Sequence, residues 1–506
     1  MTDRGSSTRS VPPVQHPEQL FIGGEWVRPS SDDHFDVIDS NDEELYYRVA
    51  AAGSADMARA VDSARGAFDS GPWPQLDHAE RAGHLRAMAD ELRARSPQLA
   101  DLWPRESGIL SRLARGSGVT GGAILDGYAD LAESFIWEER VPTTNGEPFG
   151  MLIREPVGVV GAIVPWNGPL SLALYKLAPA LLAGCTVVLK ASPEAPGALY
   201  IIAEAAEAAG LPPGVLNVLT AGREVSAELV ADRRVDKISF TGSTEAGRRI
   251  ASALGERIGR YTLELGGKSA AVILSDADLV AAAESIAGSS CILTGQVCAS
   301  LTRLIISRDR HDDFVSILAD AMSRNRVGHA FDPRSDMGPL ASADQRDRVE
   351  RLIARAIAEG APPVLGGRRP PDQERGYFLE PTLFDHVDNQ STLARTEVFG
   401  PVLAVVPARD DDHAVALANE SIYGLNASVF TADASRAQSV ARRLRSGTVG
   451  HNGSRVDYGI GFGGFKQSGV GREGGVQGLA PYLETKTLIL REAPSAESPT
   501  SQPTTR

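Results

Sequence analysis

The sequence predicts an α/β fold with two doubly wound domains and a small β-arm, and three observations carry this expectation. The chain has 506 residues, too many for a single hydrophobic core, so two or more domains are expected. From residue 157 onward, short β-branched runs alternate with stretches of helical periodicity, which is typical of doubly wound α/β domains. Between Val141 and Arg154 apolar residues alternate with polar ones, which indicates a hairpin arm.

The N-terminal part precedes the first buried strand. Residues 1–18 are polar and are expected to be disordered, and they lack the apolar core of a signal peptide. Residues 21–26 predict a short hairpin around a Gly-Gly turn. Apolar residues recur at helical spacing over 54–100 and again over 117–137, so helices that pack as a scaffold are expected there.

The two α/β units follow one another along the chain. Residues 157–164 form a nearly continuous apolar, valine-rich run, typical of a parallel strand buried on both faces. Residues 493–506, rich in Ser, Pro and Thr, are expected to be a disordered tail. Further strands are expected at 185–190, 215–219 and 237–240 in the first unit, and at 303–307, 402–407, 427–431 and 447–450 in the second.

Composition bounds the partners and the compartment. Apolar content of 42% and charged content of 23% are ordinary for a globular enzyme. The net charge of −14 disfavours nucleic acid and anionic membranes as partners. Only Cys185, Cys291 and Cys298 carry thiols, which favours a reducing, cytoplasmic compartment over a disulfide framework. No Cys or His spacing typical of a metal site occurs, so no metal is predicted.

Two stretches of small residues hold a candidate catalytic pair. Glu264 lies just before the Gly266-Gly267 pair, and Cys298 follows a glycine-containing loop. Small neighbours leave a thiol open to a substrate carbon, and glycine lets the carboxylate segment turn toward a cleft. The pair indicates covalent catalysis, with a sulfur nucleophile and a base that activates water. A single cysteine taken alone is more often a small buried hydrophobic residue.

Gly242 and Ser243 lie between an expected strand and an expected helix. Free backbone amides and the positive helix end make such a turn suited to a pyrophosphate. The alternative is an ordinary helix N-cap, because Ser and Thr are good caps in any case. The preceding strand favours the nucleotide site.

Six motifs occur in order along the chain. They are PWNGP (165–169), FTGST (240–244), LELGGK (263–268), TGQVCA (294–299), EVFGP (397–401) and FGGFKQSG (462–469). With them the chain resembles the NAD(P)-dependent, non-acylating aldehyde dehydrogenase superfamily from about Phe21 to Lys486. The resemblance implies an aldehyde dehydrogenase-like α/β fold and the oxidation of an aldehyde to its carboxylic acid.

The resemblance assigns three catalytic roles. The Cys298 thiolate attacks the aldehyde carbon to give a thiohemiacetal. The side-chain amide of Asn167 and the backbone amide of Cys298 stabilise the oxyanion that develops. After hydride loss leaves a thioester, Glu264 deprotonates the water that releases the acid.

The resemblance also implies NAD as cofactor. Glu397 would contact the nicotinamide ribose, Phe399 would form a wall beside the ring, and Trp166 and Lys190 would lie on the adenosine side. Many family members carry a glutamate three residues after this lysine, where it repels a 2′-phosphate. Here that position is proline, and Glu194 follows one residue later. NAD is therefore expected to be preferred and NADP to be tolerated.

The expected substrate pocket departs from the family pattern at Gly168, where many members carry a bulky aromatic residue. A small residue at the mouth and apolar walls predict a medium or bulky hydrophobic aldehyde. The other expected lining residues are Ser171, Tyr175, Val297, Ala299 and Phe462.

The resemblance divides the chain into parts. Residues 19–140 and 157–266 are expected to form a nucleotide-binding domain, and 267–465 a catalytic domain. Residues 141–156 and 480–492 are expected to form a bridging and oligomerisation arm, which implies a homodimer or homotetramer.

Two other functions remain open from the sequence. A cysteine-dependent esterase or thioesterase would use Cys298 and Glu264 without redox chemistry, but it leaves Glu397 and the nucleotide-like turn unexplained. A catalytically silent structural protein on the same fold would need none of these residues.

Overall fold

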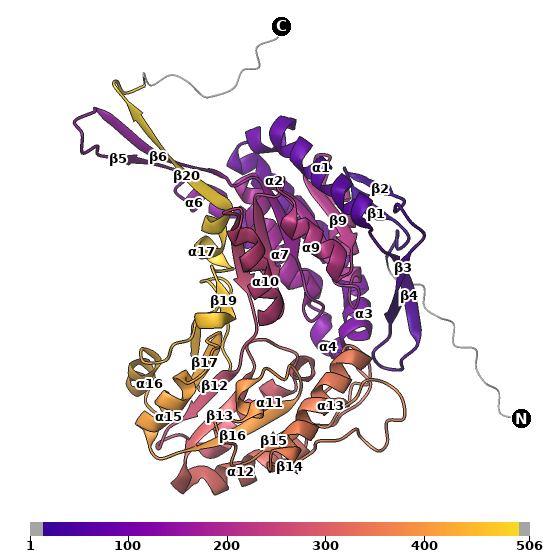
Figure 1. Cartoon of the computed structure of the whole chain (residues 1–506), viewed down its shortest axis with the longest axis vertical. Coiled ribbons are helices and arrows are strands. Elements are labelled where there is room, and N and C mark those ends of the chain that lie inside the picture. The colour runs from indigo at the N-terminus through magenta and orange to yellow at the C-terminus, as the bar shows by residue number, and fades with distance from the viewer. Residues whose placement is uncertain (1–13, 495–506) are drawn as a thin grey trace, which may run out of the picture.

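The computed structural model describes residues 14–494, which form two α/β lobes and a long β-arm that projects from one of them (Figure 1). The upper lobe in Figure 1 holds the indigo-to-magenta half of the chain and the lower lobe the orange part. Residues 1–13 and 495–506, most of the two segments expected to be disordered, lie outside the described residues. Within 14–494, every helix is too short or too polar to traverse a lipid bilayer.

The expected disorder of residues 1–18 is wrong for residues 14–18. Val14 is buried against the core of the upper lobe, and the backbone amide of Gln15 donates to Oε1 of Glu204 at 2.9 Å. The His16 ring stacks on Trp26 with 4.6 Å between centroids. These partners are distant in sequence, so local composition does not reveal them.

The upper lobe is built on an eight-stranded sheet with the order β19-β11-β10-β7-β8-β9-β1-β2. Strands β7 to β11 run parallel, while the β1–β2 hairpin and β19 are antiparallel edges. Strands β7 to β10 are buried at every position, as expected when helices cover both faces. The strands are β1 (Leu20–Ile22), β2 (Glu25–Val27), β7 (Val159–Ile163), β8 (Thr186–Ala191), β9 (Leu216–Thr220), β10 (Lys237–Thr241), β11 (Arg260–Glu264) and β19 (Gly469–Val470).

Two helices of this lobe begin directly at motif residues. Helix α7 starts at Pro169, whose fixed φ suits the first helical position, and α10 starts after the N-cap Ser243. Each follows a strand end, so both helix starts face the same edge of the sheet. The helices are α1 (Ser54–Ser70), α2 (His78–Ala94), α3 (Ser96–Ser107), α4 (Ser111–Ala114), α5 (Ser117–Ala129), α6 (Leu131–Ser134), α7 (Pro169–Ala183), α8 (Gly197–Ala208), α9 (Arg223–Ala231), α10 (Thr244–Gly255) and α17 (Gly475–Leu479).

The lower lobe contains a seven-stranded sheet with the order β14-β15-β16-β13-β12-β17-β18, parallel except for β14. Its strands are β12 (Ser269–Ile273), β13 (Leu301–Ser307), β14 (Pro363–Leu365), β15 (Thr382–Phe384), β16 (Val402–Ala408), β17 (Asn426–Phe430) and β18 (Thr448–His451). Its helices are α11 (Leu279–Ser290), α12 (Arg308–Ser323), α13 (Ala343–Ala358), α14 (Thr392–Arg395), α15 (Asp411–Asn419) and α16 (Ala434–Ala441).

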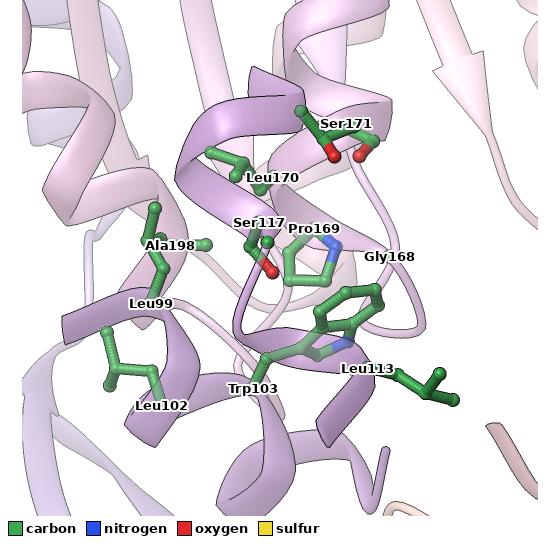
Figure 2. A pocket seen from close by; sticks show the side chains of 12 residues that line it. Leu99, Leu102, Trp103, Leu113, Ser117, Gly168, Pro169, Leu170, Ser171 and Ala198 are labelled. Carbon is green, nitrogen blue, oxygen red and sulfur yellow. The ribbon is translucent and has the colours of Figure 1, made fainter. Parts of the chain in front are cut away.

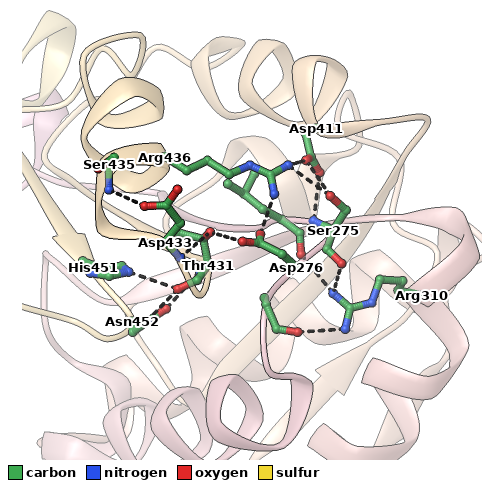
Figure 3. Close-up of polar contacts among 12 residues, drawn as sticks. Ser275, Asp276, Arg310, Asp411, Thr431, Asp433, Ser435, Arg436, His451 and Asn452 are labelled. Carbon is green, nitrogen blue, oxygen red and sulfur yellow. Dashed lines mark hydrogen bonds and ion pairs between the residues drawn. The ribbon is translucent and has the colours of Figure 1, made fainter.

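Polar contacts fix the strand ends of the lower lobe to its helices (Figure 3). Arg436 of α16 lies 2.7 Å from Asp276 and also pairs with Asp411 of α15. Thr431, just after β17, donates to Asp276 at 2.7 Å, and Arg310 of α12 donates to backbone carbonyls just after β12. This network joins α12, α15 and α16 to the carboxyl edge of the sheet.

The arm is a three-stranded sheet that leaves the upper lobe (Figure 1). Strand β6 (Phe149–Pro156) pairs antiparallel with β20 (Leu483–Leu490) over its whole length and with β5 (Glu138–Val141) on its other side. A separate hairpin consists of β3 (His34–Ile38) and β4 (Leu45–Ala50).

The structure has the predicted two α/β domains and β-arm, and the expected hairpin at 21–26 is confirmed. Strands β14 and β15, with three residues each, were not predicted, nor were the β3–β4 hairpin and β11, whose last residue is the candidate base Glu264.

Candidate active site

A cavity of about 370 Å³ lies between the two lobes, and seven of the nine predicted catalytic and cofactor residues line it, Glu264 and Lys190 being the exceptions. The upper lobe contributes residues that follow β7 and β10, and the lower lobe contributes the loops before β13 and β16. The predicted residues that line the cavity are Trp166, Asn167, Gly242, Ser243, Cys298, Glu397 and Phe399. Arg223, Gln345 and Arg348 also line it and were not predicted.

The loop that carries Cys298 has a strained, strongly fixed backbone. Leu293 and Thr294 have φ of 48° and 54°, in the left-handed region that branched residues rarely adopt. The Thr294 hydroxyl lies within hydrogen-bond distance of the carbonyls of Gly338 and Pro339, at 2.9 and 3.0 Å, and so holds this conformation. Gly295 has φ of +72°, and a Cβ there would lie 2.3 Å from a carbonyl oxygen of the Glu397 loop. Cys298 therefore follows a turn whose backbone is fixed by its neighbours.

The Cys298 thiol is protonated at rest. Burial, followed by the nearby carboxylates of Glu397 and Glu264, raises the pKa of Cys298 to about 12. A thiol with such a pKa needs a base before it can attack, since the thiolate is the nucleophile. The negative charges of Glu397 and Glu264 therefore act on the Cys298 thiol.

The side chain of Glu264 is buried at the end of a strand. It ends β11, is 3% exposed, and within residues 14–494 neither carboxylate oxygen has a hydrogen-bond partner. Burial and then Glu473 raise the pKa of Glu264 well above its ordinary range, against the opposing effect of Lys176. A Cβ on Gly463 would approach Oε1 of Glu264 to 2.7 Å, so the glycine leaves space beside the carboxylate. An orphaned, basic carboxylate beside a thiol suits general-base catalysis.

Asn167 is held at the end of β7 by contacts to both lobes. Its Nδ2 donates to the carbonyl of Gln296 at 2.9 Å, two residues before the nucleophile. Its own carbonyl accepts a hydrogen bond from the indole of Trp103 at 3.0 Å. Gln296 is fully buried and accepts the amide of Ala341 at 2.9 Å. No role was predicted for Gln296, although it lies in the motif at 294–299, and neither pattern nor spacing marks Trp103.

Glu397 and Phe399 belong to a loop that the lower lobe fixes through its backbone. Oε1 of Glu397 accepts the amide of Gly267 at 3.0 Å, and Arg348 donates to the carbonyls of Glu397 and Val398 at 2.7 and 2.6 Å. The Phe399 ring meets Trp166 edge-on at 5.5 Å between centroids. Phe399 has φ of 58°, so its side chain is directed by an unusual backbone.

A second cavity of about 440 Å³ adjoins the first, because Arg223 and Ser243 line both. Ser243 accepts the amide of Ala246 at 3.2 Å as the N-cap of α10, which is one of the two interpretations expected for it, and it also lines both cavities. Lys190 and Glu194 also line the second cavity. Burial lowers the pKa of Lys190 to about 8, and Glu194 partly opposes this shift.

The predicted substrate residues divide into two groups. Gly168 and Ser171 line a separate apolar cavity of about 240 Å³, where the Trp103 indole lies next to Pro169 (Figure 2). Leucine side chains from the surrounding helices complete its wall, namely Leu99, Leu102, Leu113 and Leu170.

The remaining predicted substrate residues lie around Cys298. Val297 and Cys298 contact a small apolar cluster that contains Ala299 and Phe462. Tyr458, which the sequence analysis missed, joins this cluster; its ring lies 4.5 Å from Phe462 and stacks on the predicted Tyr175 at 4.4 Å. Two aromatic contacts thus connect Tyr175 to the thiol region.

The fold and the site define a two-domain α/β enzyme with a thiol, a buried carboxylate and a cavity between the domains that adjoins a second one in the upper lobe. The model of the aldehyde dehydrogenase family matches residues 26–488, and the chain belongs to this family. The predicted fold class and reaction class, NAD(P)-dependent aldehyde oxidation, are thereby confirmed.

Individual relatives agree with this assignment. Geranial dehydrogenase from Castellaniella defragrans is 43% identical over 474 residues, covering 94% of this chain and 98% of the relative. A crystal structure of Mycobacterium tuberculosis aldehyde dehydrogenase complexed with NAD+ has a TM-score of 0.91 at 41% identity, covering 94% of this chain and 98% of that one. A mutant of aldehyde dehydrogenase C from Pseudomonas syringae, complexed with NAD+ and octanal, has a TM-score of 0.91 at 35% identity, covering 96% and 99%.

Proposed function

We propose that this aldehyde dehydrogenase oxidises medium or bulky hydrophobic aldehydes, with Cys298 as nucleophile, Asn167 as oxyanion donor and Glu264 as base. The observation that carries the proposal is the orphaned Glu264 carboxylate in the neighbourhood of a protonated Cys298 thiol. A buried carboxylate without partners destabilises the fold, so its retention supports a catalytic role.

The roles follow in sequence. The Cys298 thiol loses its proton to water, and Sγ bonds to the aldehyde carbon. The carbonyl oxygen becomes an alkoxide, which Nδ2 of Asn167 and the amide of Cys298 stabilise. A bound nicotinamide cofactor supplies the hydride acceptor. Once the thioester has formed, Glu264 takes a proton from water, the resulting hydroxide attacks the acyl carbon, and the acid leaves as the Cys298 thiol is restored.

The cofactor residues of this chain fit a dinucleotide. The two adjoining cavities run past the N-terminus of α10, and Ser243 lines both of them. Glu397 has one carboxylate oxygen on the Gly267 amide and accepts two hydrogen bonds well, which suits a ribose diol. The carboxylate of Glu194 lines the adenosine-side cavity, which supports NAD as the preferred cofactor and NADP as a tolerated one.

The hydrophobic substrate class rests on the apolar surfaces near the thiol. Leucines and Trp103 line the cavity at Gly168, and Tyr458 and Phe462 lie near Cys298. The relatives named for geranial and solved with octanal act on or bind hydrophobic aldehydes, which supports the same class here.

The assembly and location are also proposed. The domain boundaries are those expected from the sequence, with residues 141–156 and 480–492 as the oligomerisation arm. This arm presents exposed strands, including Ile489 at 50% exposure, which supports a homodimer or a tetramer of dimers. The three cysteines are free, which supports a reducing, cytoplasmic location.

The first test is absorbance of the reduced nicotinamide. Wild type and Cys298→Ala receive NAD or NADP with short, long, branched and aromatic aldehydes. Reduction by wild type alone, fastest with long or bulky aldehydes and NAD, is the expected result. Preference for short polar aldehydes would contradict the substrate class. Ester hydrolysis without nicotinamide, in place of reduction, would favour the esterase alternative.

A further inference from the structure

Two histidines and an aspartate meet far from the active site, at the carboxyl edge of the lower sheet. His311 lies in the first turn of α12, directly after β13. Asp385 and His386 directly follow β15. Cys298 precedes β13, so the cluster lies at the other edge of the sheet, near the foot of the lower lobe (Figure 1). None of the proposed catalytic roles involves this cluster.

The side-chain atoms converge on one point. Nε2 of His311 lies 2.8 Å from Oδ1 of Asp385, and Nδ1 of His386 lies 2.9 Å from Oδ2 of the same carboxylate. The two imidazole rings are 4.2 Å apart between centroids. One potential ligand atom from each residue lies within 4.8 Å of the others.

A neighbouring carboxylate selects the tautomer of His311. Nδ1 of His311 lies 2.9 Å from Oδ1 of Asp312, so in the neutral ring the proton belongs on Nδ1. Nε2 then presents a lone pair toward Asp385. Metal-binding histidines very often have this arrangement, with the far nitrogen donating to a carboxylate that fixes the ring.

Nε2 of His311 and the Asp385 carboxylate lie close together without a hydrogen bond between them. The His311 side chain is 1% exposed, and Nε2 has no hydrogen-bond partner within residues 14–494 although the carboxylate is close. Asp385 lies off the direction of a ring N–H, so a proton on Nε2 would be poorly shared. A buried lone pair that faces a carboxylate is stabilised by a cation held between them.

The backbone of His386 is strained in a way that directs its ring. His386 has φ of 48°, a left-handed conformation that costs free energy for a non-glycine residue. Asp385 accepts the backbone amide of His386 at 2.6 Å, which holds the turn. The His386 side chain is 65% exposed, so one side of the cluster is open for an ion to enter from solvent.

We propose that His311, Asp385 and His386 form a binding site for a divalent transition-metal ion of the Zn²⁺ type, with water as the remaining ligand. Two imidazoles and one carboxylate are a donor set that suits such ions better than Mg²⁺ or Ca²⁺. Ligands about 2.1 Å from a tetrahedral ion lie roughly 3.4 Å apart, so the contacts of His311 and His386 with Asp385, at 2.8 and 2.9 Å, both have to lengthen by about half an ångström. The ion would join the start of α12 to the β15 loop. Sequence spacing could not reveal this site, because its residues come from two separate strand ends.

The test uses Co²⁺ as a spectroscopic probe on full-length, tag-free protein after dialysis against a chelator. Wild type is expected to bind one Co²⁺ per chain with visible d–d absorption and no thiolate-to-metal charge-transfer band, and Zn²⁺ is expected to displace it. His386→Asn removes a ligand while asparagine tolerates the left-handed backbone, and it is expected to weaken binding at least tenfold. Asp312→Asn alters only the tautomer-fixing partner and is expected to weaken binding about tenfold or more.

His34→Asn is the matched control. His34 is an exposed histidine 3.7 Å from Asp36, outside the cluster, and its loss is expected to leave Co²⁺ binding unchanged. Equal melting temperatures of metal-free wild type and His386→Asn would show that the variant is folded. Absence of Co²⁺ binding in wild type would overturn the proposal and leave the cluster as a protonated ion pair. Binding that survives in His386→Asn, or that shows a thiolate band and is lost in Cys298→Ala, would also overturn it.

Discussion

Replacing Glu264 by glutamine is expected to stop catalysis after the hydride has been transferred. Glutamine has nearly the same shape but cannot take a proton from water, so the thioester on Cys298 should accumulate. Since neither oxygen of Glu264 is engaged in a hydrogen bond within residues 14–494, the substitution breaks no native contact. The loss therefore reports the proton transfer and not a collapsed site.

The expected magnitude follows from the role. General-base catalysis contributes about 10²–10⁴-fold, which corresponds to roughly 2.7–5.4 kcal/mol of transition-state stabilisation. The thermal stability of the variant should not fall with its activity. The pKa of Glu264 is raised in the folded state, so below the ordinary glutamate pKa the buried carboxyl group does not lower the free energy of unfolding. The free energy of unfolding falls as the pH rises from the ordinary pKa through the raised one. Glu264→Gln should therefore melt no lower than wild type at neutral and alkaline pH.

Stopped-flow absorbance of the reduced nicotinamide separates the two steps. The variant should give a burst of about one equivalent per active site, followed by a steady state at least 100-fold slower than wild type. The matched control is Glu106→Gln, another buried carboxylate with a pKa raised by burial to about 8, bonded to Tyr47 at 2.6 Å and outside the described cavities. Burst and steady-state rates that fall equally would refute the deacylation role and assign Glu264 to activation of the thiol alone.

Three further predictions test other parts of the site. Asn167→Ala should lower kcat about 10²–10³-fold with a smaller change in KM, because an oxyanion donor acts in the transition state; an effect confined to KM would contradict that role. Gly168→Phe should raise KM for long aldehydes far more than for short ones, since a Cβ there meets Leu172 only at an ordinary 3.6 Å and the ring would fill the apolar cavity; equal changes would argue against that cavity as substrate space. Alkylation of Cys298 in the cofactor-free enzyme should accelerate about tenfold per pH unit from pH 7 to 9, because its pKa is raised to about 12; a plateau near neutral pH would indicate a preformed thiolate.

The sequence predicted the parts of this molecule that are local or that occur as motifs. Continuous apolar runs are typical of buried parallel strands, so β7 and β8 were predicted within a few residues of their bounds. The motif residues Asn167, Cys298 and Glu397 were predicted by resemblance, and the structure brings them into one cavity. Their catalytic and cofactor roles remain predictions that the kinetic tests address.

The sequence could not predict residues whose importance arises from contacts between distant segments. Trp103 comes from a scaffold helix yet donates to the carbonyl of Asn167. Tyr458 has no motif around it, but it stacks on Tyr175 and lies beside Phe462. The buried polar side chain of Gln296 connects its own loop to Ser107 and Ala341 through hydrogen bonds at long sequence separation. The contacts of such residues exist only in the folded chain, so local periodicity does not predict them.

Two glycines explain how the carboxylate, the cofactor-side glutamate and the thiol share one small region. A Cβ on Gly266 would lie 2.2 Å from Oε2 of Glu397, and a Cβ on Gly267 would lie 2.4 Å from the carbonyl of Cys298. The contact at Gly267 is with backbone and cannot be relieved by a side-chain shift, and Glu397 could move away from Gly266 only at the expense of its hydrogen bond with the Gly267 amide. The segment after Glu264 therefore threads between the other two groups only because it has no side chains there. Movement of any one group would displace the others, so their spacing is set together by the backbone.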